Sequence, residues 1–205
     1  MNHITENSRN HFDKSAKHYN TSFDGRFVKP MYQKLLEALE GLPEGKLLDV
    51  GCGNGNVLVE IKNKRLTLAG IDLSPAMIQI ARERLGNHAD LRVGDAETLP
   101  FEDSQFDVII CNASFHHYPH PDQVLREMNR VLKRNGLLFI GEVYMPQPLR
   151  ALINLSFRFS TSGDYKTYGK QELKKMLQRN GFSMDGVDST GIRTVLYKAR
   201  ADKPL

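Results

Sequence analysis

The stretch LLDVGCGNGN at residues 47–56 decides the fold, because an apolar run enters a glycine-rich turn that a helical pattern follows. Glycines in such a turn let a ligand approach the backbone, and the next helix directs its N-terminal N–H groups towards that ligand. The dinucleotide fingerprint requires glycine at its first, third and sixth positions. Here glycines occupy 51, 53 and 55, and Asn56 fills the sixth position. The turn therefore predicts a ligand other than NAD.

Three acidic residues around this turn narrow the class of ligand. Asp49 precedes the first glycine by two residues, which suits an ammonium or sulfonium group better than a pyrophosphate. Asp72 ends the next apolar run, where doubly wound folds place a carboxylate that accepts the ribose hydroxyls. Asp95 follows the third run, where its side chain and the N–H of Ala96 are placed to meet an adenine amine and a ring nitrogen. Together they predict an adenosine that carries a positive tail.

The rest of the chain alternates strands and helices in the manner of a parallel sheet. Five nearly continuous apolar runs are typical of strands covered on both faces: KLLDV, RLTLAGI, ADLRV, FDVIIC and GLLFIGEV. Helical patterns over 56–64, 75–85 and 121–133 separate them, and a strand pair near 183–189 and 192–199, turning at Thr190-Gly191, closes the chain. We expect an α/β fold with a Rossmann-like, doubly wound, seven-stranded, mostly parallel sheet, an antiparallel last strand and an N-terminal helical extension.

The length of 205 residues fits one domain with a single core. We expect residues 1–205 to divide into a helical cap over 1–45, a cofactor-binding core over 46–145, and a last part over 146–205 that holds a lid segment, a helix and the strand pair. No apolar run is long enough to span a membrane, and the first residues lack the apolar core of a secretion signal, so a cytoplasmic location is expected.

Five blocks give the chain a family resemblance: LLDVGCGNG, GIDLSPAMIQIAR, GDAETLPF, FDVIICNASFHHY and VLREMNRVLKRNGLLFI. In order and spacing they resemble the class I S-adenosylmethionine-dependent methyltransferases, most closely the methyltransferase type 11 family that includes ubiquinone and menaquinone biosynthesis enzymes. The resemblance implies S-adenosylmethionine as the cofactor, and direct in-line transfer of its methyl group to an acceptor.

The resemblance also assigns residues to parts of the cofactor. The methionine end of the cofactor would contact Asp49, Gly51, Cys52, Gly53 and Asn56. The ribose would contact Asp72 and Leu73, and the sulfonium would lie over Asn112 and Ala113. The adenine would contact Asp95, Ala96 and Glu97, with Met77 at its edge. Tyr19, in the segment expected to cover the cofactor, would either place its ring near the sulfonium or serve as a packing residue.

The segment CNASFHHYPHP after the fourth run bears on catalysis. It lacks the Asp/Asn-Pro-Pro-aromatic run of amino-group methyltransferases, and instead places His116 and His117 in the crevice at the strand ends. Either histidine could accept a proton, although a role in positioning the acceptor is favoured. Cys52 and Cys111 are interpreted as pocket walls, and no Cys or His spacing predicts a metal.

The acceptor should bind between residues 10–34 and 146–168, whose aromatic, aliphatic and basic side chains suit a small amphipathic or acidic molecule. The candidate residues are Phe12, Tyr19, Phe23, Phe27, Leu149, Leu152, Ile153, Leu155, Phe157 and Phe159, with Arg150, Arg158 and Lys166. A small-molecule acceptor is favoured, because no nucleic-acid-binding region is appended. Two alternatives stay open. The first is an RNA or protein methyltransferase that uses the basic flanks, residues 1–34 and 146–205, which together carry a net charge of +9. The second is a non-catalytic S-adenosylmethionine-binding protein. The oligomeric state cannot be inferred from the sequence.

Overall fold

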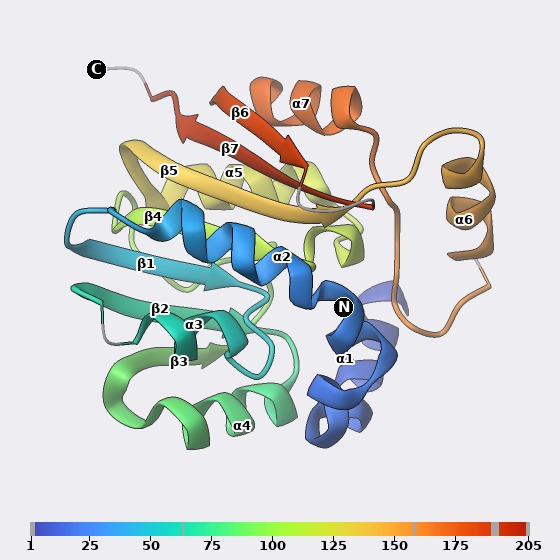
Figure 1. Cartoon of the computed structure of the whole chain (residues 1–205), viewed down its shortest axis with the longest axis horizontal. Helices are drawn as coiled ribbons and strands as arrows, with labels where there is room; N and C mark the ends of the chain where they lie inside the picture. The colour runs from blue at the N-terminus through green and yellow to red at the C-terminus, as the bar shows by residue number, and fades with distance from the viewer. Residues whose placement is uncertain (1–2, 63, 158, 190–192, 204–205) are drawn as a thin grey trace.

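A seven-stranded sheet organises the computed structural model, which describes residues 3–62, 64–157, 159–189 and 193–203 (Figure 1). The strand order is β3-β2-β1-β4-β5-β7-β6. The strands are β1 (Gly45–Val50), β2 (Leu66–Asp72), β3 (Ala89–Val93), β4 (Phe106–Asn112), β5 (Leu132–Val143), β6 (Phe182–Ser189) and β7 (Thr194–Ala201). The strands β2 and β4 pair with opposite edges of β1, so the order of strands in the sheet changes direction at β1. In doubly wound folds such a point leaves a crevice at the carboxyl ends of the strands.

The pairing confirms the expected fold class. Strands β1 to β5 are all parallel to one another, whereas β7 is antiparallel to both β5 and β6. The five apolar runs all form strands, each within a few residues of its expected bounds. The expected turn at Thr190-Gly191 lies outside the described residues.

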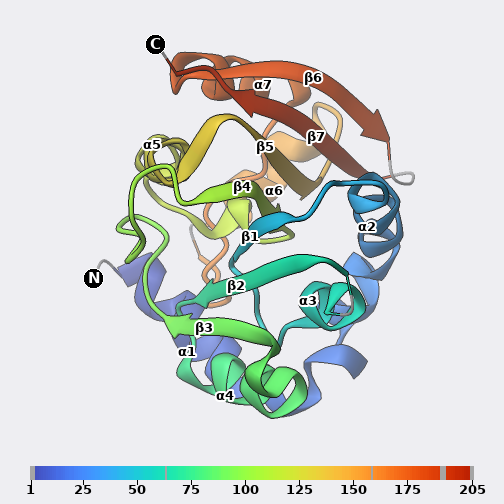
Figure 2. The ribbon, with the colours of Figure 1, turned by 90° about the vertical axis from the view of Figure 1, so that its left-hand side faces the viewer.

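Helices cover both faces of the sheet (Figure 2). One face packs against α2 (Phe23–Leu39), α3 (Asn56–Ile61) and α4 (Pro75–Leu85), and the other against α5 (Pro121–Val131) and α7 (Lys170–Arg179). Leu35 and Leu39 of α2 are fully buried on the first face, so this helix belongs to the core. The first half of α2 also reaches the strand ends, where Phe27, Val28 and Tyr32 line the cavities described below.

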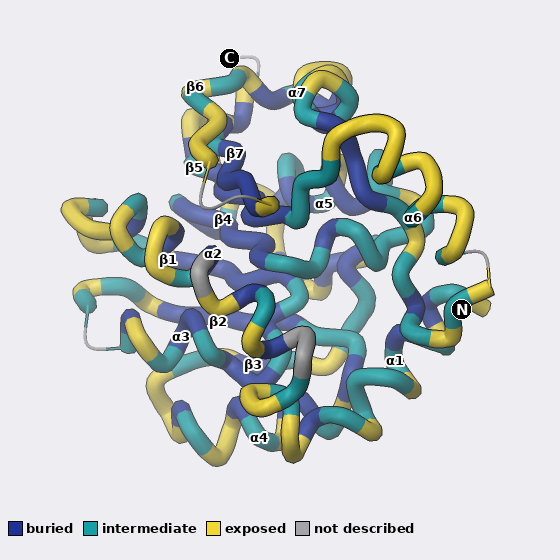
Figure 3. The backbone as a smooth tube through the Cα atoms, turned by 45° about the vertical axis from the view of Figure 1, so that its right-hand side comes forward, coloured by how far each residue is buried: buried dark blue, intermediate teal, exposed yellow. Residues whose placement is uncertain are grey.

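Two helical segments border the crevice. The first comprises α1 (His3–Ser15) and the 3-10 helix η1 (Ala16–Thr21), and α1 contacts both α4 and the short helix η3 (Phe115–His117). The second is α6 (Leu149–Phe157), in a stretch whose sequence shows no clear periodicity. Figure 3 shows α6 as a largely exposed segment, and it has no fully buried residue. No helix in the described part of the chain has the length and apolarity to cross a membrane.

Candidate functional site

The glycine turn joins β1 to α3 and is tied to the neighbouring strand, because the N–H groups of Gly51 and Cys52 donate to the carbonyl of Ile71 at 2.8 and 3.0 Å. Gly51 has φ +75°, and a Cβ there would lie 1.9 Å from Oγ of Ser114. Gly53 has φ +52°, and a Cβ there would meet no atom within 4 Å. Gly51 thus permits a close approach of two chain segments, whereas Gly53 borders open space.

Asp49 is in β1, directly before this turn, and is 2% exposed. Burial, and to a smaller extent the charge of Asp72, raise the pKa of the Asp49 carboxyl to about 8. None of the described cationic side chains forms an ion pair with it. A buried carboxyl group without a cationic partner suits a ligand that supplies the positive charge itself.

Replacing Asp49 by asparagine should remove a pH dependence of stability. The folded ligand-free chain keeps the Asp49 proton up to about pH 8, whereas the unfolded chain loses it near pH 4. The contribution of this group is therefore fully present below pH 4 and is lost as the pH rises towards 8, by up to about 1.4 kcal/mol per pH unit. Urea unfolding between pH 5 and 8 should show the wild type losing stability relative to Asp49→Asn. Parallel curves for the two proteins would contradict the assignment.

Asp72 stands at the end of β2, and both its oxygens already accept a backbone hydrogen bond. Oδ2 accepts from the N–H of Gly53 at 2.8 Å and Oδ1 from the N–H of Ser74 at 2.9 Å. Burial is the largest influence on this group and raises the pKa of the Asp72 carboxyl. A carboxylate has about four acceptor positions, so two remain for ligand hydroxyls.

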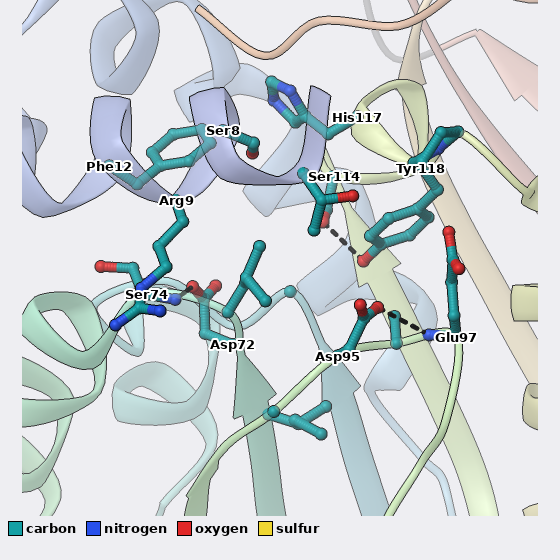
Figure 4. Close-up of a pocket in the computed structure, with 17 residues that line it drawn as sticks. Ser8, Arg9, Phe12, Asp72, Ser74, Asp95, Glu97, Ser114, His117 and Tyr118 are labelled. Atoms are coloured by element: carbon teal, nitrogen blue, oxygen red, sulfur yellow. Dashed lines mark hydrogen bonds between the residues drawn. The ribbon is translucent and has the colours of Figure 1, made fainter. Parts of the chain in front are cut away.

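Figure 4 shows one cleft over Asp72 and Asp95, with Phe12 and Arg9 of α1 above them. Oδ1 of Asp95 accepts from the N–H of Glu97 at 2.9 Å, and the Glu97 carboxylate pairs with His120 at 2.9 Å. The predicted residues that line this cleft are Gly51, Asp72, Leu73, Asp95, Ala96, Glu97 and His117. The structure thus groups the residues expected at the ribose and adenine, with the exception of Met77.

A second cleft adjoins the first and is shared by residues expected at the methionine end. Both amide atoms of Asn112 are buried here without a hydrogen-bond partner in the described structure, which leaves them available to a polar ligand. Met77, expected at the adenine edge, lines this cleft instead and is 1% exposed. The predicted residues that line it are Tyr19, Asp49, Gly51, Cys52, Gly53, Asn56, Asp72, Met77, Asn112, Ala113 and His117.

The two cysteines differ in position. Cys52 lines the second cleft, whereas Cys111 is fully buried in the core and lines none of the described cavities. Burial is the main influence on both and raises their thiol pKa values well above the usual range. Both thiols therefore stay protonated near neutral pH, which disfavours a nucleophilic role.

The N-terminal cover, which consists of α1 and η1, is bound to the glycine turn and to the start of α4 by hydrogen bonds. Oδ1 of Asn20 in η1 accepts from the side-chain amides of Asn54 at 3.0 Å and Asn56 at 2.8 Å. Asp13 of α1 accepts from the Ser74 hydroxyl at 2.5 Å. The cover and the cofactor clefts thus form one structural unit.

His116 and His117 lie in η3, directly after β4 and its short loop. Nδ1 of His116 lies 2.8 Å from Oε2 of the buried Glu142, while Nδ1 of His117 lies 3.2 Å from the carbonyl oxygen of Gly163. Burial, followed by the charge of His116, lowers the pKa of His117 to about 4. His117 lines both clefts, whereas His116 faces only the larger cavity described next.

A third cavity of about 410 Å³ lies on the other side of the histidines, between the N-terminal cover and α6. Many of its walls are apolar, with Phe12, Tyr19, Phe27, Val28, Ala113, Val143, Met145, Ile153 and Phe157. Its polar walls are His11, His116, His117, Ser162, Asp164, Thr167 and Arg193. Leu152 and Phe159, expected in this region, are instead 64% and 85% exposed. The side chains of Phe23 and Arg158 lie outside the described structure.

The structure adds site residues that the sequence interpretation did not assign. Ser114 and Tyr118 share a hydrogen bond of 2.7 Å and line the first cleft, and both belong to the quoted segment CNASFHHYPHP. Ser8 and Arg9 line the same cleft from α1. The only two residues of α1 described as buried are Thr5 and Ser8, so no apolar periodicity could have marked this helix.

Comparisons with known proteins agree with this geometry. Residues 48–140 match the family model described as a methyltransferase domain. The demethylmenaquinone methyltransferase of Thermotoga maritima is 35% identical over 176 residues, which cover 77% of this chain and 75% of that protein. In four further relatives the match spans only 36% to 60% of the relative's own length.

Solved structures share the fold. A solved complex of the Haloferax volcanii Trm112 methyltransferase activator contains a protein that superposes with a TM-score of 0.80 at 20% identity, covering 97% of this chain and 99% of that one. The geranyl diphosphate C-methyltransferase of Streptomyces coelicolor, solved with Mg²⁺ and S-adenosylhomocysteine, gives 0.70 at 17% identity, covering 86% and 77%.

The chain therefore belongs to the class I S-adenosylmethionine-dependent methyltransferases, in the family that includes the demethylmenaquinone methyltransferases. Its cofactor is S-adenosylmethionine, and the residues present fit that molecule. The ligand's cationic end suits the unpaired Asp49 carboxyl, and its polar methionine end suits the unpartnered amide of Asn112.

Proposed function

We propose that the protein methylates a small, largely apolar acceptor that carries at least one polar group. The observation that carries this proposal is the third cavity, whose volume of about 410 Å³ falls within the range of roughly 300 to 1,000 Å³ typical of small-molecule sites. Its apolar walls would hold the body of the acceptor, and its polar walls include His116, His117 and the nearby Asp164. One relative is named a demethylmenaquinone methyltransferase and another a sterol 4-C-methyltransferase, and these names support an acceptor of this class.

The cavity adjoins the cofactor clefts through shared walls. Ala113 and Tyr19 line both the methionine-end cleft and the third cavity, and Phe12 and His117 line all three. S-adenosylmethionine, when bound, supplies an electrophilic methyl group on a sulfonium. Asp49 and Asn112 would hold its charged end and Asp72 its ribose, so that the methyl group faces the acceptor near Ala113.

The protein would accelerate the transfer mainly by holding the two reactants in line and excluding water, effects that contribute roughly 7 to 11 kcal/mol in favourable cases. His116 and His117 would position the polar group of the acceptor. Phe12 packs edge-on against the rings of His117 and Tyr19, at centroid distances of 5.1 and 6.1 Å. It thereby covers the place where the cofactor clefts meet the third cavity.

A labelled-methyl screen tests the acceptor class. The wild-type chain is incubated with labelled S-adenosylmethionine and separate small-molecule, RNA and protein fractions of a cell extract. We expect label in the small-molecule fraction. Label in RNA, with binding that weakens steeply as salt rises, would support the alternative that the basic flanks bind nucleic acid. Cofactor binding without transfer to any fraction would support a non-catalytic protein.

Filling the third cavity should block the acceptor and spare the cofactor. Ile153 lines the cavity from α6, so Ile153→Trp should raise the acceptor KM by about tenfold or more, equivalent to about 1.4 kcal/mol or more. Leu152→Trp is the matched control, because Leu152 is on the same helix and 64% exposed. Calorimetry should give equal S-adenosylmethionine affinities for both variants. Equal KM values in the two variants would place the acceptor elsewhere.

A further inference from the structure

Two histidines and one aspartate form a compact cluster in the third cavity. One nitrogen of His116, one of His117 and one carboxylate oxygen of Asp164 lie within 4.8 Å of one another. Nε2 of His116 is 3.5 Å from Oδ1 of Asp164, and Nδ1 of His117 is 3.6 Å from the same oxygen. All three residues line the third cavity.

These separations are longer than hydrogen bonds, for which N–H···O distances are about 2.7 to 3.2 Å. They match the spacing of ligands around one ion, since two atoms each about 2.1 Å from a tetrahedral centre lie about 3.4 Å apart. Two imidazoles and one carboxylate are also a common ligand set for divalent transition metals.

The surrounding hydrogen bonds orient this ligand set. Oε2 of Glu142, whose side chain is 5% exposed, lies 2.8 Å from Nδ1 of His116, and Oε1 accepts the N–H of Phe115 at 2.8 Å. If Nδ1 of His116 donates to this carboxylate, the neutral ring keeps a lone pair on Nε2, directed at the oxygen of Asp164. Two such electron-rich atoms repel one another unless a metal ion or a proton lies between them, and the metal titration described below distinguishes the two. A carboxylate behind a histidine is the usual support of a metal-binding imidazole.

The segment that carries Asp164 is held against the histidines. The N–H groups of Tyr165 and Lys166 both donate to the carbonyl of His116, at 2.9 and 3.0 Å. Gly163 has φ +80°, and a Cβ there would lie 2.3 Å from Cα of Ser8 in α1. The Ser162 hydroxyl donates to Oδ2 of Asp164, which leaves Oδ1 towards the rings. The cluster is therefore built by the fold, although its residues are distant in sequence.

We propose that His116, His117 and Asp164 bind a divalent transition-metal ion, of the Zn²⁺ or Co²⁺ type, in the acceptor cavity. Nδ1 of His117 exchanges its contact with the Gly163 carbonyl for the metal bond. Three protein ligands leave at least one coordination position open towards the cavity. An oxygen, nitrogen or sulfur atom of an acceptor can fill it. The inference revises the expectation from sequence that no metal binds, and it rests on the proposed function only for naming the cavity.

Metal titration of the full chain tests the site. The protein is stripped with a chelator, then titrated with Zn²⁺ by calorimetry and with Co²⁺ by visible absorption, whose intensity reports the coordination geometry. One equivalent of each ion should bind. Asp164→Asn should weaken binding at least 100-fold, because the anionic ligand is lost, and Glu142→Gln should weaken it by about 10- to 100-fold through His116. His120→Asn is the control, since His120 pairs with Glu97 outside this cavity and should leave the affinity unchanged.

The outcomes separate this inference from the methyltransferase proposal. S-adenosylmethionine affinity, measured for each variant, reports on folding, and Asp164 lines neither cofactor cleft. The absence of stoichiometric binding in a folded wild type, or binding that survives in Asp164→Asn, would overturn the metal site and leave a shared proton between the three side chains. Metal binding without methyl transfer to any acceptor would keep the site and contradict the proposed function.

Discussion

Replacing Asp72 by asparagine is expected to weaken S-adenosylmethionine binding by about 10- to 100-fold, because hydrogen bonds to a charged group contribute about 1.5 to 3 kcal/mol. Asp72 lines both cofactor clefts, and its two backbone partners leave acceptor positions for the ribose. Asparagine keeps the size of the side chain but replaces one acceptor oxygen by a donor. Calorimetric titration with S-adenosylmethionine gives the affinity directly.

Asp90→Asn provides the control for this measurement. Asp90 lies in the adjacent strand β3, but its side chain is 53% exposed and pairs with Arg92 at the surface. Its substitution should leave the cofactor affinity unchanged, since exposed ion pairs contribute little. If the Asp72 and Asp90 variants bind the cofactor equally well, Asp72 has no part in the site.

The second large effect is expected at Gly51. Gly51→Ala should destabilise the protein by about 2 to 5 kcal/mol, because a left-handed backbone costs about 1 to 2 kcal/mol and overpacking about 1 to 3 more. The new Cβ would lie 1.9 Å from Oγ of Ser114 and 2.9 Å from the Tyr118 hydroxyl. Urea unfolding measures the loss.

Gly53→Ala separates backbone strain from steric conflict. Gly53 has φ +52° but open space around its Cβ position, so only the backbone cost of about 1 to 2 kcal/mol applies. Adding Ser114→Gly to Gly51→Ala should recover part of the stability, because the two positions are in direct contact. Equal losses at both glycines, with no recovery in the double variant, would show that the close approach to Ser114 is unimportant.

The cofactor half of the site was largely predictable from the sequence, because parallel strands end at one edge of the sheet and deliver Asp49, Asp72 and Asp95 to it. Each of these strands is an apolar run that can be recognised from its own sequence, without knowledge of the strands that pair with it. The position of Met77 was less predictable. Its α4 backbone begins beside the ribose residues, but which cleft its side chain lines depends on tertiary packing.

The acceptor half was only partly predictable. The sequence identified Phe12, Phe27, Ile153 and Phe157 as candidates, but it did not distinguish inward from outward side chains in α6, where apolar residues occur on both sides. Asp164 was not identified at all. Its meeting with His116 depends on a loop whose path is set by hydrogen bonds rather than by periodicity.

The position of Phe12 has a consequence for turnover. Phe12 of α1 is a wall of both cofactor clefts and of the acceptor cavity. A single side chain of the N-terminal segment therefore borders the sites of both reactants. Since a segment that covers an active site often limits product release, we expect any movement of α1 to affect the release of both products.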